Sequence, residues 1–261
     1  MRTQSHSAFS LVELSIVLVI LGLLTGGILG GQSLIRAAEL RAVSTEYSRY
    51  VTATQTFRDK YFALPGDMMN ATAFWGTAAA CPGTHTTPST SEVTCNGNAN
   101  GAIDISSTAQ EHFRFWQHLA NAGLIEGRYT GVTDSAVNQL SATPGRNVPS
   151  SKLARAGWYA LQGWGLALPS DSNLFEGNYD SIFIFGSPSL NYTEGAVLKA
   201  EEAWNIDIKS DDGRPGLGKI RVYERQIDCH NGGVQSTPVA TVANYANSNT
   251  SSDACTLIIT Q

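Results

Sequence analysis

The chain has 261 residues, a formal net charge of −5 and 15% charged residues. This length allows one sizeable domain or a modest two, and the ordinary composition argues against disorder throughout. The charges are scattered, so no basic face is available to neutralise phosphates, and the sequence disfavours a dedicated role in nucleic-acid binding.

The first element is an apolar run over residues 9–35, which is long enough as a helix to cross the roughly 30 Å hydrocarbon layer of a membrane. Between Arg2 and Arg36 the only charged side chain is Glu13. A secretory signal peptide is the alternative, but no small-x-small cleavage site follows a short apolar core. The small residue Ala8 stands before the apolar run instead, so cleavage there leaves the whole hydrophobic helix on the mature protein.

The stretch "A-FSLVELSIVLVILGLL" resembles the N-terminus of type IV prepilins and of the pseudopilins of type II secretion systems. In those families a prepilin peptidase cuts before the Phe and methylates the new amino group. The resemblance implies cleavage between Ala8 and Phe9, a methylated Phe9, and Glu13 as the acidic fifth residue of the mature chain. Gly22 matches the glycine that interrupts the hydrophobic helix in many members.

Two positions depart from the family pattern. The residue before the cut is usually Gly and here is Ala8, a change that these families tolerate. Where many members carry a helix-loosening Pro, this chain has Gly30 within a group of glycines, and each glycine weakens a helix by roughly 1 kcal/mol relative to alanine. The Gly-x-x-x-Gly spacing within this group permits close helix approach, and flexibility without a specific contact explains it equally well.

Glu13 is costly inside a membrane, where ionisable groups are rare and usually have a partner. In a filament of such subunits, Glu13 of one chain would neutralise the positive Phe9 amine of its neighbour, so that burial is tolerated only on assembly. The alternative is a glutamate near the membrane interface that reaches water.

Past Arg36 the pattern changes to an amphipathic helix, because apolar or aromatic residues recur in steps of three and four. They are Leu40, Val43, Tyr47, Tyr50, Thr54, Phe57 and Tyr61. Pro65 and Gly66 in "ALPGD" end the pattern. We therefore expect one continuous helix of about 50 residues, whose second half packs on a globular body.

The rest of the chain predicts a mixed body. A second helix is expected from "TAQE", where Thr108 and Glu111 have capping-box spacing, to Gly123, with an aromatic face toward the body. Another short helix is expected from Thr193. Strand-like runs cover residues 157–168, 181–186, 218–224 and 256–260. The sequence therefore predicts an α+β fold with mostly antiparallel strands, as in pilin-like proteins, divided into a leader (1–8), a spine helix (9–62) and a globular domain (63–261).

The four cysteines, Cys81, Cys95, Cys229 and Cys255, have no C-x-x-C spacing, which argues against a zinc ribbon or a thioredoxin-type pair. Three pairings into two disulfides exist, and the spacing favours Cys81 with Cys95 and Cys229 with Cys255, each worth about 3 kcal/mol in the chain-entropy model. Four reduced, buried thiols are the alternative. Disulfides would place the body in an oxidising compartment such as a periplasm.

Two stretches are candidate calcium sites. Asn96, Asn98, Asn100 and Asp104 echo the spacing of an EF-hand loop, although Ser107 stands where a bidentate acid is needed. An Asn/Gly turn beside Cys95 explains the same residues.

The second candidate is the acidic cluster Asp207, Asp211 and Asp212 before a Gly-Arg-Pro turn. Carboxylates this close repel each other unless a cation or a basic neighbour is present. The alternative is turn chemistry, in which aspartates cap backbone amides.

No catalytic motif is present. His85, His112, His118 and His230 show neither H-E-x-x-H spacing nor a nucleophile partner, and G-x-S-x-G and phosphate-binding glycine loops are absent from the sequence. We interpret the chain as the substrate of an enzyme, not as an enzyme, and we expect no cofactor apart from the calcium considered above.

The resemblance implies a structural subunit of a type IV pilus or a type II secretion pseudopilus. Its expected partners are the prepilin peptidase, other pilin or pseudopilin subunits, the inner-membrane assembly platform and the lipid bilayer. It would cross the inner membrane once, with a cytoplasmic N-terminus and a periplasmic body. A filament-tip adhesin or a substrate-binding minor pilin, using the 81–95 and 229–255 loops, is the alternative, and a membrane-tethered enzyme would need a pocket that no motif predicts.

Overall fold

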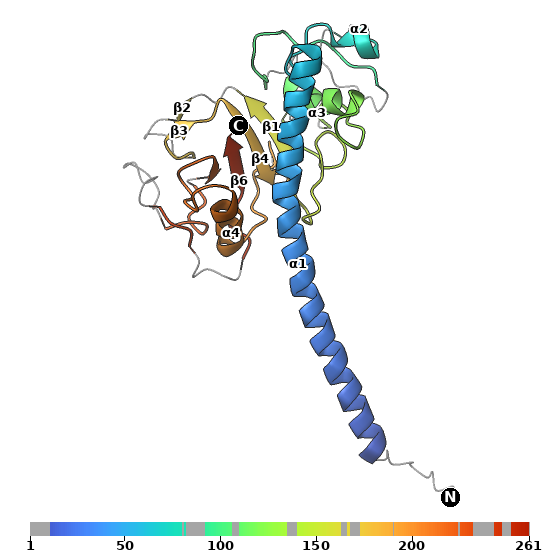
Figure 1. Cartoon of the computed structure of the whole chain (residues 1–261), viewed down its shortest axis with the longest axis vertical. Coiled ribbons are helices and arrows are strands. Elements are labelled where there is room, and N and C mark those ends of the chain that lie inside the picture. The colour runs from blue at the N-terminus through green and yellow to red at the C-terminus, as the bar shows by residue number, and fades with distance from the viewer. Residues whose placement is uncertain are drawn as a thin grey trace, which may run out of the picture.

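A computed structural model describes residues 11–79, 81, 92–105, 110–134, 140–162, 166–167, 173–189, 191–223, 225–231, 243–246 and 252–260. One long helix, α1 (Leu11–Tyr61), carries the body on its C-terminal half, while its N-terminal half projects away from the body (Figure 1). The expected continuous helix is confirmed, and it has 51 residues.

The body contains three further helices and six strands among the described residues. The helices are α2 (Ala71–Trp75), α3 (Glu111–Asn121) and α4 (Ala200–Ser210). The strands are β1 (Gly157–Gln162), β2 (Leu166–Ala167), β3 (Gly177–Asn178), β4 (Ser181–Gly186), β5 (Ile220–Val222) and β6 (Leu257–Thr260). Together these elements give the predicted α+β architecture.

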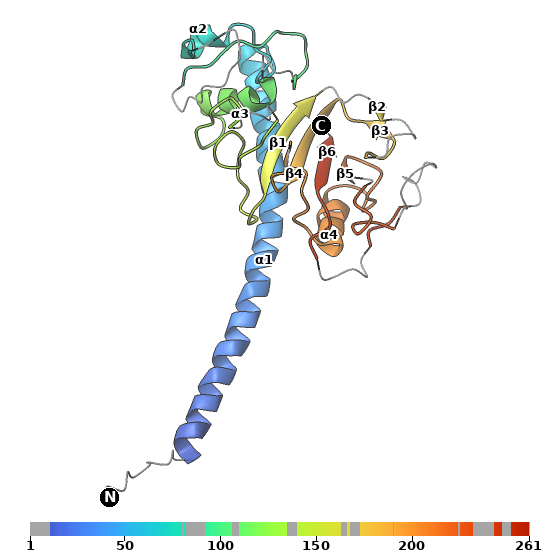
Figure 2. The same cartoon turned by 180° about the vertical axis from the view of Figure 1, so that it is seen from behind.

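The main sheet has the strand order β1-β4-β6-β5, and every neighbouring pair is antiparallel. Strand β4 lies at its centre, with Phe183 opposite Ala160 of β1 and Ile259 of β6. Strands β2 and β3 form a separate two-stranded sheet. The C-terminal half of α1, which we call the docked half (residues 36–61), crosses one face of the main sheet, as the opposite view also shows (Figure 2).

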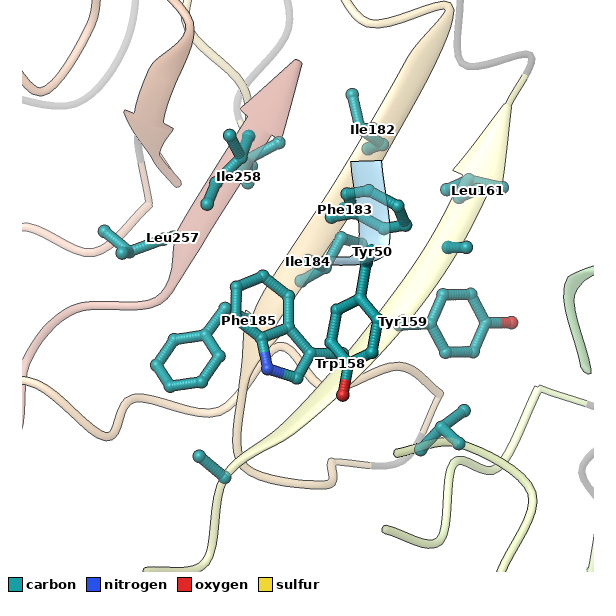
Figure 3. Close-up of a cluster of buried hydrophobic side chains, with 14 of the residues drawn as sticks. Tyr50, Trp158, Tyr159, Leu161, Ile182, Phe183, Ile184, Phe185, Leu257 and Ile258 are labelled. Atoms are coloured by element: carbon teal, nitrogen blue, oxygen red, sulfur yellow. The ribbon is translucent and has the colours of Figure 1, made fainter. Parts of the chain in front are cut away.

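The core lies where α1 meets the sheet, and Tyr50 is its central contact. The Tyr50 ring lies 5.0 Å from the ring of Trp116 on α3 and 5.6 Å from that of Trp158 on β1, both edge to face. Its neighbour Phe183 on β4 lies beside it in the core (Figure 3) and also contacts Tyr47 of α1. Aromatic packing therefore joins α1, α3 and the sheet in one cluster.

The stop of α1 follows the predicted breaker closely. The amide of Phe62 still donates to the carbonyl of Arg58, but Phe62 adopts a φ of 53°, outside the helical region. Pro65 disfavours helix at the residue before it, so the chain turns away here. The breaker sequence and the observed end agree.

Three predicted boundaries are wrong. Helix α3 begins at Glu111, after Gln110 at φ 46°. Glu111 is therefore the first helical residue and not the third, as a capping box would require. Its expected partner Thr108 lies outside the described residues. Helix α4 begins at Ala200 instead of Thr193. At this observed start, the carboxylate of Glu202 accepts a hydrogen bond from the Lys199 amide.

The strand expected over residues 157–168 is also divided. Strand β1 ends at Gln162, and Leu166 and Ala167 pair with β3 in the separate sheet. Gly163 and Gly165 interrupt, in the sequence, a run whose apolar residues alone read as continuous. Hydrophobicity located these strands but did not divide them.

Both disulfides have the pairing that the spacing favoured. Cys81 is bonded to Cys95, with Cα atoms 5.6 Å apart, and Cys229 to Cys255, with Cα atoms 5.1 Å apart. The second bridge ties the 229–231 segment to Cys255, two residues before β6, and the backbone of Cys255 also pairs with Leu198. The alternative of four reduced thiols is wrong in this structure.

Candidate functional site

The candidate site is the N-terminal half of α1, which we call the apolar half (residues 11–35). None of its residues is buried, and its most apolar window has a mean hydropathy of 2.4. Leu18 is 62% exposed and Leu29 is 68% exposed. At 1.5 Å per residue the apolar half is roughly 37 Å long, enough to cross a bilayer. Among the described residues α1 is the one helix with this length and composition.

The few hydroxyl groups of the apolar half are satisfied within the helix. Ser15 donates to the carbonyl of Val12, Thr25 to that of Leu21, and Ser33 to that of Gly30, at 2.8 to 2.9 Å. Such bonds let Ser and Thr lie in hydrocarbon without an unsatisfied donor. The hydroxyl residues here are therefore compatible with a membrane.

Glu13 lies in the first turn of α1, where the positive end of the helix dipole favours a carboxylate. Ala8 and Phe9, the residues of the expected cleavage, lie outside the described residues. The pairing of Glu13 with the Phe9 amine of a neighbouring chain therefore stays a prediction.

The glycines of the apolar half leave an open surface. A Cβ atom added at Gly22, Gly26, Gly27, Gly30 or Gly31 would meet no atom within 4 Å. The helix nevertheless continues through all five positions. A second helix can approach closely at this surface, and the explanations by close packing and by flexibility both remain.

The docked half of α1 (residues 36–61) contains a polar anchor that the hydrophobic pattern did not reveal. Glu46 is buried on the side of the body, and its carboxylate accepts hydrogen bonds from the Ser151 hydroxyl, the Lys152 amide and the Trp158 indole at 2.7 to 2.9 Å. Its position three residues after Val43, on the apolar stripe, was the available signal. A charged residue on such a stripe indicates a buried acceptor.

The loop at 96–104 is closed by its own side chains. The side-chain amides of Asn98 and Asn100 both donate to Asp104 Oδ2 at 2.8 Å. The Asn98 Oδ1 atom accepts the Asn100 amide, and Asn96 Oδ1 accepts the Thr72 amide. The oxygens that an EF-hand would direct to an ion thus accept hydrogen bonds from the protein itself, and those of Asn98 and Asn100 do so in Asx turns.

Two carboxylates that the sequence did not connect with this loop support it. Asp67 accepts the amides of Asn100 and Gly101, and Glu111 accepts those of Asn98 and Asp104. Burial raises the pKa of Glu111 to about 7 and raises the pKa of Asp67, although these hydrogen bonds oppose both shifts. Only the tertiary structure brings the two acids to the loop.

The acidic cluster Asp207, Asp211 and Asp212 is brought together, with one carboxylate oxygen of each within 4.8 Å of the others. Asp207 is buried and accepts the Tyr245 hydroxyl at 2.9 Å and the Gly213 amide at 3.1 Å. Burial raises the pKa of Asp207 to about 7, against the effect of these hydrogen bonds.

The other two members of the cluster also accept backbone amides. Asp211 Oδ2 accepts the amides of Lys219 and Ile220, and Asp212 Oδ1 accepts that of Arg214. The three aspartates thus hold the turn between α4 and β5. This is the geometry that turn chemistry requires.

The histidines of α3 belong to the core. His118 is fully buried, accepts the Gly66 amide at Nδ1 and lies 3.0 Å from the Thr94 hydroxyl at Nε2. Burial, reinforced by the nearby Arg114 charge, lowers its pKa to about 3, so it is neutral at ordinary pH. His112 is buried as well, and His85 lies outside the described residues.

The arrangement thus combines an uncovered apolar helix with a folded body in which Asp67, Glu111 and the clustered aspartates accept hydrogen bonds from backbone amides. Comparison with protein-family models, with curated proteins and with solved structures finds no match for this chain.

Proposed function

We propose that the chain is a structural subunit of a type IV pilus or a type II secretion pseudopilus. The observation that carries the proposal is the apolar half of α1, 25 residues with no buried side chain, continuous with a half that is docked on the body. Exposed apolar surface on this scale needs lipid or protein to cover it. Lipid covers it before assembly, and the same surface on other subunits covers it afterwards.

The resemblance at residues 8–24 supports the same proposal. It adds the route: the prepilin peptidase cuts before Phe9 and methylates the new amine, and an inner-membrane platform transfers the subunit into the filament. Glu13 then pairs with the Phe9 amine of a neighbour, which sets the axial register of the helices. The chain is on this proposal a substrate and a building block, without an active site.

The two disulfides support a body on the oxidising side of the membrane. Disulfides persist in periplasmic and extracellular proteins and are rare in the cytosol. We accordingly place the N-terminus in the cytoplasm and the body in the periplasm before assembly. Because α1 is continuous through residue 35, a single helix joins the anchor to the body.

The decisive experiment compares Glu13→Leu with Ser15→Leu, a matched change to leucine on the same helix. Both variants are expected to be inserted and to begin at Phe9 on N-terminal sequencing. Glu13→Leu is expected to be lost from sheared filaments, and Ser15→Leu to be retained. Native material that begins at Met1, or normal incorporation of Glu13→Leu, would overturn the proposal.

One feature favours the alternative of a filament-tip module. At the far end of the body from the apolar half, Phe62 is 93% exposed, Met69 64% and Phe74 56%. A groove of about 710 Å³ lies beside Phe62, with Arg58 and Asp67 in its wall. A tip module would be scarce in sheared filaments yet required for binding, whereas a repeating subunit would be abundant.

We infer that the acidic cluster holds the turn after α4 and needs no ion. The supporting observation is that each of its three carboxylates accepts backbone amides. Calcium at millimolar concentration is therefore expected to leave the melting temperature of the purified chain unchanged, as is a chelator. A rise of several degrees that Asp211→Asn removes would instead establish a calcium site.

A further inference from the structure

A groove of about 530 Å³ lies on α1 where the apolar half meets the body, and we call it the basic groove. Its lining residues are Ile35, Ala38, Glu39, Arg41, Ala42, Thr45, Glu46, Arg49 and Lys152. One end is apolar, formed by Ile35 and the two alanines. The remainder carries three exposed cations, Arg41, Arg49 and Lys152, in a chain whose net charge is −5.

The cations of the basic groove are available, while its carboxylates are engaged. Within the described part of the chain, the side chains of Arg41 and Lys152 have no ion pair or hydrogen bond, and Arg49 donates only to the Tyr50 hydroxyl. Glu46 accepts three hydrogen bonds from the body, and Glu39 lies 3.5 Å from Arg36. The groove thus presents positive charge to the outside.

The basic groove begins at the level where the apolar half of α1 would meet the headgroup layer of a bilayer. The apolar half ends at Ile35, which also lines the groove, and Arg41 lies six residues further along α1. Six residues of helix rise roughly 9 Å, so the backbone of Arg41 lies just beyond a headgroup layer that is roughly 5 to 8 Å thick. When the apolar half spans the hydrocarbon, the long side chain of Arg41 therefore reaches back to the level of the lipid phosphates.

We propose that the basic groove binds the phosphate of an anionic phospholipid, with the adjoining lipid chain against Ile35 and Ala38. Arginine and lysine are suited to this ligand, because a guanidinium matches two phosphate oxygens and an ammonium adds a mobile charge. The proposal rests on the membrane anchor of the proposed function. The bound lipid holds the subunit at a fixed depth and orientation until a neighbouring subunit displaces it.

The test uses the full chain in detergent, titrated with dioleoyl phosphatidylglycerol or dioleoyl phosphatidylcholine and followed by native mass spectrometry. The native chain is expected to retain phosphatidylglycerol selectively. Arg41→Gln and Lys152→Gln are each expected to weaken retention about fivefold, the effect of one basic residue near an anionic surface. Arg58→Gln and Lys60→Gln, made singly, remove the same single charge at the other end of the docked half, and each is expected to change retention less than about twofold.

Each other result has a defined meaning. Equal retention of the two lipids by the native chain, or an unchanged affinity in the Arg41 and Lys152 variants, would overturn the lipid site. Equal competition by soluble glycerol phosphate would reveal a free-phosphate site and also overturn it. If the Arg41 and Lys152 variants keep the lipid but no longer form multimers on chemical cross-linking, the lipid site is overturned and the groove is a contact between subunits. Failure of the native chain to float with vesicles would instead contradict the anchor, and with it the proposed function.

Discussion

The two halves of α1 have the same backbone and opposite surroundings. The apolar half has no buried residue, whereas the docked half buries Val43, Tyr50 and Phe57 completely or almost so. The docked half is held by packing, which is the usual source of helix stability in water. The apolar half has no such contacts and is suited to a solvent that offers no competing hydrogen bonds. One helix thus belongs to two environments, divided near Arg36.

The largest difference between the two halves is expected when a large side chain is truncated to alanine on each. Tyr50→Ala should lower the free energy of unfolding of the body by about 3 to 5 kcal/mol, because it removes an aromatic ring from a packed core. Leu18→Ala, on the apolar half, should change it by less than about 0.5 kcal/mol. Urea unfolding of the detergent-solubilised chain, followed by near-ultraviolet circular dichroism, measures both. Similar losses would contradict the division of α1.

The polar anchor of the docked half is expected to have the next largest effect. Glu46→Ala leaves the Ser151 hydroxyl, the Lys152 amide and the Trp158 indole without their acceptor, at a cost of about 3 kcal/mol. Glu39→Ala, seven residues earlier and near the surface, should cost less than about 1 kcal/mol. The same unfolding assay applies, and equal costs for the two glutamates would show that Glu46 does not anchor the helix.

The pH dependence sharpens the contrast at the far end of the docked half, where His118 stacks near Phe57 with ring centroids 6.3 Å apart. The pKa of His118 is lower in the folded chain than in the unfolded chain. The contribution of neutral His118 to folding stability is therefore complete above the pKa of the unfolded chain and is lost as the pH falls below it. Between pH 7 and pH 5 the native chain should lose about 2 kcal/mol that His118→Gln does not lose. Parallel pH profiles for the two proteins would contradict a neutral, buried histidine.

The smallest effect is expected at the boundary between the halves. Arg36 forms a two-point ion pair with Glu202 at the start of α4, with distances of 2.7 and 2.6 Å. Both side chains are partly exposed, so Arg36→Gln should lower the free energy of unfolding by less than about 1 kcal/mol. Differential scanning calorimetry can resolve this change. A loss as large as that of Tyr50→Ala would move the boundary of the docked half toward the N-terminus.

Much of the fold was predictable because local rules act on neighbouring residues. The 3.6-residue period located the docked half of α1, Pro65 predicted its end, and the cysteine spacing predicted both bridges. Helix starts were less accessible. Helix α4 begins at Ala200, after a segment in which Gly195 pairs with Ser187 and Leu198 pairs with Cys255. Because Cys255 is distant in the sequence, neighbouring residues do not reveal where this helix begins.

The candidate site divides in the same way. The apolar half and Glu13 stand out in the sequence, since both are defined by a contiguous run. The sequence does not mark Glu46, Asp67 and Glu111 as buried hydrogen-bond acceptors, because each becomes one only when amides from another segment are folded against it. The basic groove likewise needs Lys152, 111 residues after Arg41 in the chain, to lie beside α1.

A long helix with an apolar half, a lone acidic residue in that half, and two disulfide-closed loops could all be predicted from the sequence alone. These follow from hydrophobicity, periodicity and spacing, which depend on residues close together in the chain. The tertiary structure decided which carboxylates are buried, how the strands pair and which cations gather at the base of the body. Those features depend on contacts between distant segments, and such contacts form only when the core around Tyr50 and Phe183 closes.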